Sequence, residues 1–482
     1  MKRFRAEYFI IIASFIALRL SLIHRFPLFA DEVTYIDWAQ QLASGKTHPF
    51  ISLELGIEPF FIWVTAFFYK FVHAPLLAGR LTSLLFDTLT LITGFQLTKR
   101  LIGRKAQIIF GILYTLFPLT LLHSSLALLD ITTASLMGMA VLGSVVLTLS
   151  KPTYRSLMFL PLTLTLALLT KPLALVSVPS LFLAPLLLNT SGQRLKKMAQ
   201  IVGLSMLGGF IVGIINFPFR TNVGILYSTY KKDPFVPLSV QIAVTKLNLW
   251  RLKLWLTAYG GIATLMTLVG GGLLVFIKKN RQGIFLFSWF SSVLLLEIVI
   301  GGKIFYPRHT TLAALPLILF LTFVLTRIKP RFLMLLLFVV ITFFFVRLDT
   351  VLLTQPTQAH IALEDRFQFF EDWVSGVGLR EVQHQLIRLS LTQPIVVFVE
   401  RDNFVRYALT HVYPVPNATF ILEPKLTQQS EALPPAISQQ RKLSLTYILL
   451  NRKQSLPPNW SLTPIYEFAK SPTQKLLLYE VR

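Results

Sequence analysis

Long apolar segments dominate the first 348 residues of the chain, and short basic stretches separate them. A helix that crosses a bilayer needs about 20 mostly apolar residues. Inside a bilayer each backbone polar group must be satisfied within the protein, which favours helices. The pattern therefore predicts eleven membrane-spanning helices, at residues 8–23, 76–98, 106–123, 126–148, 156–170, 173–189, 200–217, 255–277, 283–300, 311–326 and 332–347.

The basic residues lie in alternate connections between these segments. Lys and Arg concentrate in the cytoplasmic loops of membrane proteins. We therefore expect the N-terminus in the cytoplasm and everything beyond residue 349 on the opposite side. The clusters that set this orientation are Lys2-Arg3-Arg5, Lys99-Arg100-Arg104-Lys105, Lys151-Arg155, Arg194-Lys196-Lys197, Lys278-Lys279-Arg281 and Arg327-Lys329-Arg331.

Three segments on the outer side do not fit the spanning pattern. Residues 59–73 are apolar and aromatic, but a span there would invert every later loop. They are predicted to form a re-entrant or juxtamembrane helix. Residues 33–44 have the periodicity of an amphipathic surface helix. Residues 216–254 form a long loop rich in Tyr, Trp, Lys and Arg, which suits either a lid or ordinary interfacial anchoring.

Beyond residue 349 the pattern changes to short apolar runs typical of strands. Strands are expected at 394–400, 418–422, 445–450 and 475–480, with helices at 377–390 and 402–411. The predicted fold class is an all-α polytopic membrane bundle, residues 1–348, followed by a small extracytoplasmic α/β domain, residues 349–482.

Composition supports this division and narrows the function classes. Hydrophobic residues make up 54% of the chain and charged residues 14%, whereas soluble proteins carry about 25% charged residues. The net charge of +24 lies almost wholly in the membrane part, with 33 Lys and Arg against 10 acids. The expected partner is thus the anionic cytoplasmic leaflet rather than nucleic acid. The chain contains no cysteine, and no phosphate-binding loop, dinucleotide fingerprint or HExxH motif supports ATP-driven transport or zinc proteolysis.

With this topology, ionisable residues of both signs collect on the outer side. Charged groups near hydrocarbon are costly and usually functional, so we expect a polar cavity that opens outward. The acids are Asp31, Glu32, Asp37, Glu54, Glu58, Asp130 and Glu297, and the basic and imidazole groups are Arg80, His123, Lys171, Lys303, Arg308 and His309.

The acids Asp31, Glu32 and Asp130 are the candidate catalytic residues. Asp31 and Glu32 follow the first span, and Asp130 begins the fourth. A carboxylate there can act as a general base on a hydroxyl. Alternatively, these acids cap the N-terminal ends of helices, and each such cap contributes about 1 kcal/mol to stability. Asp31 and Asp130 could also hold Mg²⁺ or Mn²⁺, although two acids do not establish a metal site.

The segment from Lys303 to His309 carries the candidate phosphate-binding group. The guanidinium of Arg308 is permanently charged and binds phosphate through two parallel hydrogen bonds. With Lys303 and His309 it could hold a lipid phosphate and stabilise it as a leaving group; the alternative is contact with lipid headgroups. Arg80 and Lys171 are further candidates. Two other acids, Asp87 and Glu297, are expected to be structural partners of buried basic groups.

Several motifs together resemble the GT-C superfamily of membrane glycosyltransferases. The resemblance is to its bacterial protein O-mannosyltransferase-like and aminoarabinose-transferase-like branch, similar to glycosyltransferase family 39. The motifs occur in the family's order along residues 8–320, and an outer-domain stretch follows them. They are Ala30-Asp31-Glu32-x-x-Tyr35-x-x-x-Ala39, Arg80-Leu-Thr-Ser-Leu84, Lys99-Arg-Leu-Ile-Gly-Arg104, Leu169-Thr-Lys171-Pro, Tyr306-Pro-Arg308-His309-x-x-x-Ala-Ala-Leu-Pro316 and Glu371-Asp-Trp373-Val-Ser375-Gly376.

The resemblance implies an integral inner-membrane enzyme that takes a sugar from a polyprenyl-phosphate carrier. Asp31 would match the first-loop acid, the base or acceptor ligand, and Asp130 a second outer acid. Arg308 and Lys171 would match basic positions near the donor phosphate. The residues expected to position donor or acceptor are Glu58, Tyr35, Tyr306 and His123. The chain departs from the family in two places: Glu58 precedes Pro59 where a basic residue is usual, and His309 replaces a common Tyr.

The predicted activity is transfer of the sugar, by inverting displacement, to a lipid, glycan or protein acceptor outside the membrane. A transporter or lipid-carrier flippase also explains many helices with charges among them, but such proteins commonly contain inverted repeats, and none is evident. An inactive scaffold whose outer domain binds a partner is the third reading. No cofactor is firmly implied beyond the divalent cation considered above.

Overall fold

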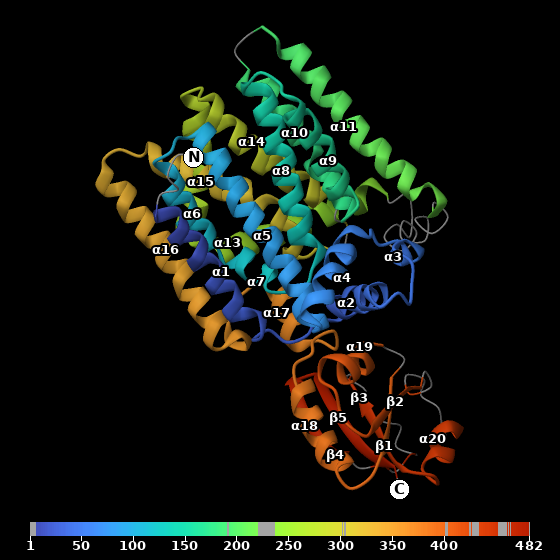
Figure 1. Cartoon of the computed structure of the whole chain (residues 1–482). Helices are drawn as coiled ribbons and strands as arrows, with labels where there is room; N and C mark the ends of the chain where they lie inside the picture. The colour runs from blue at the N-terminus through green and yellow to red at the C-terminus, as the bar shows by residue number, and fades with distance from the viewer. Residues whose placement is uncertain are drawn as a thin grey trace.

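The computed structural model describes residues 6–189, 192–219, 237–300, 302, 305–400, 403–423, 426, 433–451, 460, 462 and 464–481. Within these ranges the chain forms a bundle of helices with a smaller sheet domain attached at one end (Figure 1). Lys303 and residues 220–236 of the predicted lid lie outside the described residues.

Each of the eleven predicted spans is helical in the structure. Among the described residues, eight helices are long and apolar enough to cross a membrane, and the bent pair α6–α7, with an angle of 55°, makes a ninth. The bundle consists of α1 (Ala6–Ile23), α5 (Pro75–Leu101), α6 (Ala106–Thr115), α7 (Pro118–Ser124), α8 (Leu129–Leu149), α9 (Tyr154–Leu168), η1 (Pro172–Ser177), α10 (Val178–Leu188), α11 (Arg194–Asn216), η2 (Phe217–Phe219), α13 (Leu238–Ile277), α14 (Arg281–Ile300), η3 (Pro307–Ala313), α15 (Ala314–Arg327) and α16 (Arg331–Thr354).

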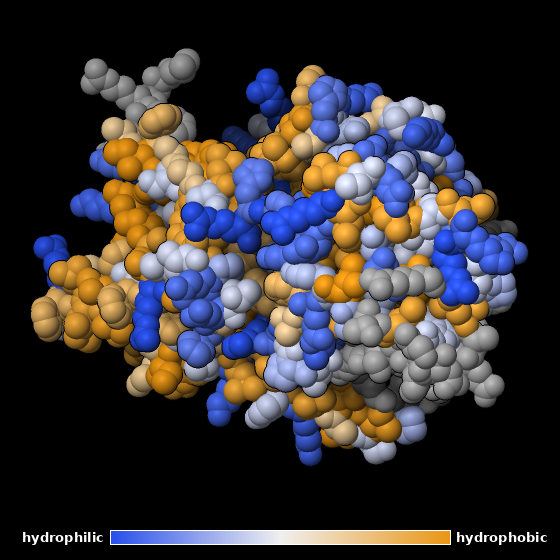
Figure 2. Space-filling model, turned by 90° about the horizontal axis from the view of Figure 1, so that it is seen from below, coloured by the Kyte–Doolittle hydropathy of each residue, from blue (hydrophilic) through white to orange (hydrophobic). Residues whose placement is uncertain are grey.

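The surface of the bundle has the character of a membrane protein. Helices α11 and α16 expose large apolar side chains such as Phe210 and Phe343, which lipid can cover. Viewed from the sheet-domain end, hydrophilic residues spread over the middle of the molecule, and hydrophobic residues gather at one margin (Figure 2). The connections that follow α5 and α15 lie at the opposite end of the bundle (Figure 1). The protein is therefore an integral membrane protein.

Three helices lie between the bundle and the sheet domain: α2 (Ala30–Ala43), α3 (Ile51–Glu54) and α4 (Phe60–Val72) (Figure 1). Helix α4 has 13 residues and is thus about 20 Å long, shorter than the roughly 30 Å of a hydrocarbon core. This length suits a surface or re-entrant helix. Helix α2 was predicted to start after the acidic pair, but Asp31 and Glu32 lie in its first turn.

The second half of the predicted outer loop is helical rather than irregular. Helix α13 begins at Leu238, well before the expected start at residue 255. It contains one break, at Gly261, with φ 74° and ψ 165°. This conformation is essentially restricted to glycine, and a Cβ atom would also come within 3.0 Å of the Phe344 ring. The lid prediction for this region remains untested.

The C-terminal domain contains a mixed sheet of order β2-β1-β3-β5-β4, in which the first three strands are parallel. The four predicted strands are present, and β4 was not predicted. Its elements are η4 (Pro356–Gln358), α17 (Leu363–Arg366), η5 (Phe367–Glu371), α18 (Leu379–Ser390), β1 (Ile395–Val399), α19 (Asn403–Tyr407), η6 (Ala408–Val412), β2 (Ala418–Leu422), α20 (Pro435–Gln440), β3 (Leu445–Leu450), β4 (Pro464–Ser471) and β5 (Gln474–Val481).

A short antiparallel bridge joins this domain to the start of α2. The Ala30 amide donates to Val374 O at 3.0 Å, and the Gly376 amide donates to Leu28 O at 2.6 Å. A side chain at residue 376 would collide with the Leu28 carbonyl, because its Cβ would lie 2.7 Å from that oxygen. The sheet domain thereby fixes the helix turn that carries Asp31.

Candidate active site

Four charged residues meet at the end of the bundle that faces the sheet domain. Each lies at or beside the start of a helix: Asp31 in α2, Asp130 in α8, Lys171 immediately before η1, and Arg308 in η3. Helix starts favour acids because of the helix dipole, but the two cations here are matched by the two acids. The structure therefore brings charges of both signs together on this side, and the polar cavity expected there stays a prediction.

Asp31 forms an ion pair with Arg308. The Arg308 Nη1 group donates to Asp31 Oδ2 at 2.7 Å, and the Asp31 side chain is 39% exposed. Two aromatic rings flank the guanidinium: its Cζ atom lies 5.5 Å from the Phe29 ring centre and 5.4 Å from that of Tyr306. The carboxylate is thus open to an incoming molecule, whereas the guanidinium is held from two sides.

Arg308 retains an unused donor. Its Nε atom is buried and has no hydrogen-bond partner among the described residues. A buried N–H without a partner costs about 1–3 kcal/mol, which an acceptor oxygen at this position would recover. The guanidinium therefore offers part of its fork to a ligand.

Asp130 and Lys171 form the second ion pair. Lys171 Nζ lies 2.6 Å from Asp130 Oδ1, with exposed side-chain fractions of 23% and 6%. Asp130 is also close enough to Arg308 and His309 to interact with both electrostatically. The two ion pairs are therefore parts of one charged cluster, to which Tyr35 adds a phenol near Arg308.

His309 and Tyr306 line the same turn. Their ring centres are 6.0 Å apart, and both side chains are partly exposed. Tyr306 and Tyr35 both lie near Arg308, and their positioning of donor or acceptor stays a prediction.

Glu32 and Arg80 have a different role from the one expected. Glu32 is fully buried and accepts from Arg80 Nε at 2.9 Å and Nη2 at 2.8 Å. Its oxygens also accept the amides of Phe29 and Ala127. The remaining Arg80 hydrogens bond to the carbonyls of Ile23, Phe26 and Pro27. All five guanidinium N–H groups are thus used, and the catalytic role of Glu32 and the phosphate-binding role of Arg80 are corrected to structural ones.

Glu58 lies apart from the ion-pair cluster. It is 6% exposed, and its Oε1 atom accepts from Asn216 Nδ2 at 2.9 Å, whereas Oε2 is buried without a partner. Burial raises the pKa of Glu58 to about 7, and the hydrogen bond from Asn216 opposes this shift. The structure places it at the junction of α4 and α11 rather than beside Arg308.

His123 belongs to a buried cluster that sequence reasoning missed. Its Nε2 atom lies 3.2 Å from Asp365 Oδ2, and Tyr259 donates a hydrogen bond to the same carboxylate. In addition, Trp255 Nε1 donates to Glu364 at 2.8 Å. Helix α17 is thereby fastened to α13 and α7. The two acids of α17 could be found only from the tertiary structure, because they follow the last span in the sequence.

Glu297 is also close to the charged cluster. It is 1% exposed, both carboxylate oxygens lack a hydrogen-bond partner among the described residues, and Asp130 and Lys171 are near enough to interact electrostatically. Among the described residues Glu297 forms no hydrogen bond with a basic group, and Lys171 is its electrostatic neighbour. The residues around Glu297 in the sequence do not distinguish it from an ordinary residue packed inside a helix bundle.

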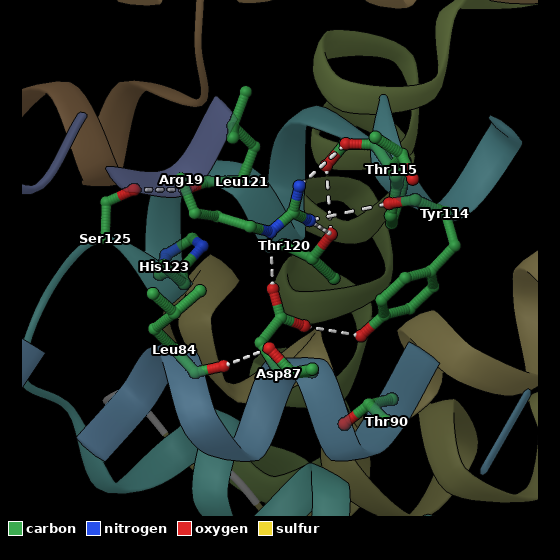
Figure 3. Close-up of polar contacts among 12 residues, drawn as sticks. Arg19, Leu84, Asp87, Thr90, Tyr114, Thr115, Thr120, Leu121, His123 and Ser125 are labelled. Carbon is green, nitrogen blue, oxygen red and sulfur yellow. Dashed lines mark hydrogen bonds and ion pairs between the residues drawn. The ribbon is translucent and has the colours of Figure 1, made fainter. Parts of the chain in front are cut away.

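Asp87, by contrast, is a structural partner, as expected. Its carboxylate accepts from Arg19 Nε at 2.8 Å and from the Tyr114 hydroxyl at 2.7 Å. The Arg19 Nη1 group donates to Thr115 O at 2.8 Å, and Arg19 and Asp87 are both fully buried (Figure 3). This network links α1, α5 and α6 within the bundle.

The charged cluster is not a convincing divalent-cation site. Among the described residues, no group of three or more His, Asp or Glu side chains is arranged to hold a metal ion. Asp31 and Asp130, the two predicted ligands, each have a cation as partner. We therefore derive no chemical step through a metal.

A small apolar cavity of about 20 Å³ lies in the bundle beside the same turn. One wall consists of η3 and α15, including Thr310 and Leu317, which follow His309 in the chain. The opposite wall is α13 around Trp255 and Tyr259, and α14 contributes Phe290 and Leu294. The apolar interior of the bundle thus begins directly after the charged residues of η3.

Comparisons with known proteins agree with this architecture. Residues 48–216 match the family model described as dolichyl-phosphate-mannose-protein mannosyltransferase. The chain is similar to the crystal structure of ArnT from Cupriavidus metallidurans in the apo state, with a TM-score of 0.62 and 14% identity over 98% of this chain and 97% of ArnT. ArnT bound to undecaprenyl phosphate gives a TM-score of 0.61 at 14% identity, with the same coverage of 98% and 97%.

A more distant similarity is to the oligosaccharyltransferase of Archaeoglobus fulgidus in complex with Zn and sulfate. The TM-score is 0.54 at 11% identity, covering 97% of this chain and 72% of that one. No curated protein matches the sequence. The chain therefore shares the overall fold of these membrane proteins, and its residues 48–216 match the mannosyltransferase family model.

Proposed function

We propose that the protein transfers a sugar from a polyprenyl-phosphate donor to a hydroxyl acceptor on the extracytoplasmic face of the membrane. The observation that carries this proposal is the contact between Asp31 and Arg308 beside the pair Asp130–Lys171. It brings together a half-exposed carboxylate, suited to a general base, and cations suited to a phosphate.

The donor phosphate has an electrostatic site at Arg308 and Lys171. Charge-assisted hydrogen bonds from a guanidinium to phosphate are short and often paired. Arg308 Nε has no partner among the described residues, and Lys171 is partly exposed. The Nε–H and one Nη2–H form the side-on fork of a guanidinium, so a phosphate can bind there next to the Nη1 contact with Asp31.

The lipid part of the donor would lie against the apolar outer surface of the bundle, which favours an isoprenoid chain over water. The cavity beside the turn that carries Arg308 is only about 20 Å³, too small to hold such a chain. The phosphate would therefore bind at the guanidinium while the chain stays outside the helix bundle. The similar ArnT structure with undecaprenyl phosphate supports this assignment.

The reaction that this arrangement suits is an inverting displacement. The acceptor oxygen forms a bond to the anomeric carbon, and its proton passes to the carboxylate of Asp31. The bond between the anomeric carbon and the phosphate oxygen breaks, and the electron pair stays on that oxygen. Arg308 and Lys171 stabilise the additional negative charge, as preorganised charges do at developing anions. Donor and acceptor approach from different sides, so positioning contributes much of the rate.

The proposal also fixes the orientation. The basic connections would face the cytoplasm, and the charged cluster and the sheet domain would lie outside the inner membrane. A labelling experiment with a single introduced cysteine tests this, since the chain has none of its own. Cysteine at Thr473, in the β4–β5 turn, should react with an impermeant maleimide in intact cells, and cysteine at Gln193 should not.

The activity test uses purified protein in detergent with radiolabelled polyprenyl-phosphate sugars and a membrane extract as acceptor pool. Label should move to the extract with the wild type and not with Asp31→Asn. The control is Glu54→Gln, an exposed acid on the same face that pairs only with His48.

Equal folding of the variants is checked by thermal unfolding. Transfer by Asp31→Asn at the wild-type rate would exclude Asp31 as the base. Absence of donor consumption, combined with movement of labelled lipid between liposome leaflets, would overturn the transferase assignment in favour of a flippase.

A further inference from the structure

A second, polar groove lies between the two domains, away from the ion-pair cluster. Its volume is about 470 Å³, within the 300–1,000 Å³ usual for small-molecule sites. Helix α2 contributes Asp37 and Gln41 to one side. The sheet domain contributes the turn from α19 to η6 and the edge strand β2. The groove therefore exists only when both domains are in place.

Hydrogen bonds fix the two walls relative to each other. The Tyr407 hydroxyl donates to Gln40 Oε1 at 2.6 Å, and Gln40 Nε2 donates to the Tyr69 hydroxyl at 3.3 Å. This chain connects the sheet domain to α2 and α4. Tyr407 is 3% exposed, and its ring centre lies 4.7 Å from that of His411. The groove thus has a rigid floor, which a binding site needs.

Three polar side chains in the groove have hydrogen-bonding groups free for a ligand. Asp37, the Gln41 amide and the Thr419 hydroxyl line the groove and make no side-chain hydrogen bond within the described residues, although Asp37 interacts electrostatically with Tyr407 and His411. They supply a carboxylate acceptor, an amide with both donors and acceptor, and a hydroxyl of both kinds. Such a mixture matches a ligand whose own groups both donate and accept, as sugar hydroxyls do.

The charge of the lining is balanced. It includes one carboxylate, Asp37, and one guanidinium, Arg406. Burial lowers the pKa of His411 below its usual 6.5, so its ring is mostly neutral at pH 7. An anion such as phosphate needs an excess of cations, and none is present. Phe420, half-buried in β2, adds an apolar surface of the kind that packs against the C–H face of a sugar.

The groove and the candidate base share helix α2. Asp37 follows Asp31 by six positions on α2, which corresponds to about 9 Å along the helix axis and about 120° around it. A ligand in the groove therefore has to extend along and around α2 to reach the Asp31 carboxylate. We propose that the groove between α2, η6 and β2 binds a neutral saccharide portion of the acceptor and presents its hydroxyl end to Asp31. This inference rests on the proposed function.

Saccharide binding is tested directly, without turnover. Purified protein in nanodiscs, free of sugar-based detergent, is examined by saturation-transfer NMR with methyl α-D-mannopyranoside and N,N′-diacetylchitobiose as probes. At least one probe should receive saturation from the wild type. Its signal should fall at least fivefold with Asp37→Ala combined with Thr419→Val, and should persist with Asp31→Asn.

The matched control for Thr419→Val is Thr473→Val, an exposed threonine in the turn on the opposite side of the sheet. Equal signals from the wild type and the double variant would overturn the inference. The inference would also be overturned if an extended peptide received saturation, neither sugar did, and the peptide signal depended on the edge of β2.

A kinetic experiment separates this inference from the proposed function. The double variant should raise KM for the acceptor at least tenfold while leaving KM for the donor unchanged. Normal transfer with an unchanged acceptor KM would refute saccharide binding in the groove but leave the transferase assignment standing. Sugar binding without any transfer would support a saccharide site in the groove and refute the transferase assignment.

Discussion

Arg308 donates from Nη1 to Asp31 Oδ2 at 2.7 Å across 277 positions of sequence. The bond joins the first turn of α2 to the first turn of η3, and so connects two segments of the charged cluster that are distant in the sequence. Asp31 is more exposed than Arg308. A ligand can therefore displace the Asp31 carboxylate from the guanidinium more readily than it can displace Arg308 from the carboxylate. An anionic donor would then free Asp31 for the acceptor.

Removal of the charge should lower activity at Asp31 and stability at Glu32. Asp31→Asn is expected to lower turnover by about 10²–10⁴, the usual contribution of a general base, with little change in unfolding temperature. Glu32→Gln leaves the buried Arg80 charge uncompensated, which costs about 3–5 kcal/mol, so the protein should unfold earlier. Turnover and thermal unfolding of both variants measure this. Full activity in Asp31→Asn together with normal stability in Glu32→Gln would contradict the assignment.

Arg308→Lys should weaken donor binding although the charge is kept. Lysine cannot reproduce the two parallel hydrogen bonds of a guanidinium. We expect KM for the polyprenyl-phosphate sugar to rise at least tenfold, and Lys171→Gln to have a smaller effect in the same direction. Lys475→Gln serves as a control, since Lys475 lies in the sheet domain and pairs with Glu467. If Arg308→Lys leaves the donor KM unchanged, the donor phosphate does not bind to this guanidinium.

The network of Arg19 and Asp87 should matter for stability and not for chemistry. Asp87→Asn leaves a fully buried guanidinium without its counter-charge, which is expected to cost about 3–5 kcal/mol. The double variant Arg19→Leu with Asp87→Leu removes both charges and should unfold at a higher temperature than either single variant. If the double variant is instead the least stable, the tyrosine and backbone contacts in Figure 3 matter more than the ion pair.

Glu58 should make the stability depend on pH. Its pKa is raised from 4.5 to about 7 in the folded protein, so between these values the folded state binds more protons than the unfolded state. Stability therefore falls as pH rises through this window, by on the order of 3 kcal/mol in total. The apparent Tm of the wild type should drop more between pH 5 and pH 8 than that of Glu58→Gln. Identical drops would mean that Glu58 is already ionised at pH 5.

Much of the site could be located from the sequence, but the division of labour within it could not. The motifs placed Asp31, Asp130, Lys171 and Arg308 on the outer side, and the structure brings these four together. Consecutive residues on a helix point about 100° apart. The acidic pair was expected before a helix and instead lies within its first turn, so Asp31 faces Arg308 and Glu32 faces Arg80.

The sequence by itself determined the membrane class, the spans and the sheet domain. Local periodicity carries this information, because a bilayer selects apolar helices and a half-buried sheet selects short apolar strands. The tertiary structure decided which charges pair, as in the contact of His123 with Asp365 and that of Arg308 with Asp31. It also decided the groove at Asp37, whose other wall comes from residues more than 300 positions later. Such contacts depend on how distant segments pack, and no local pattern encodes that.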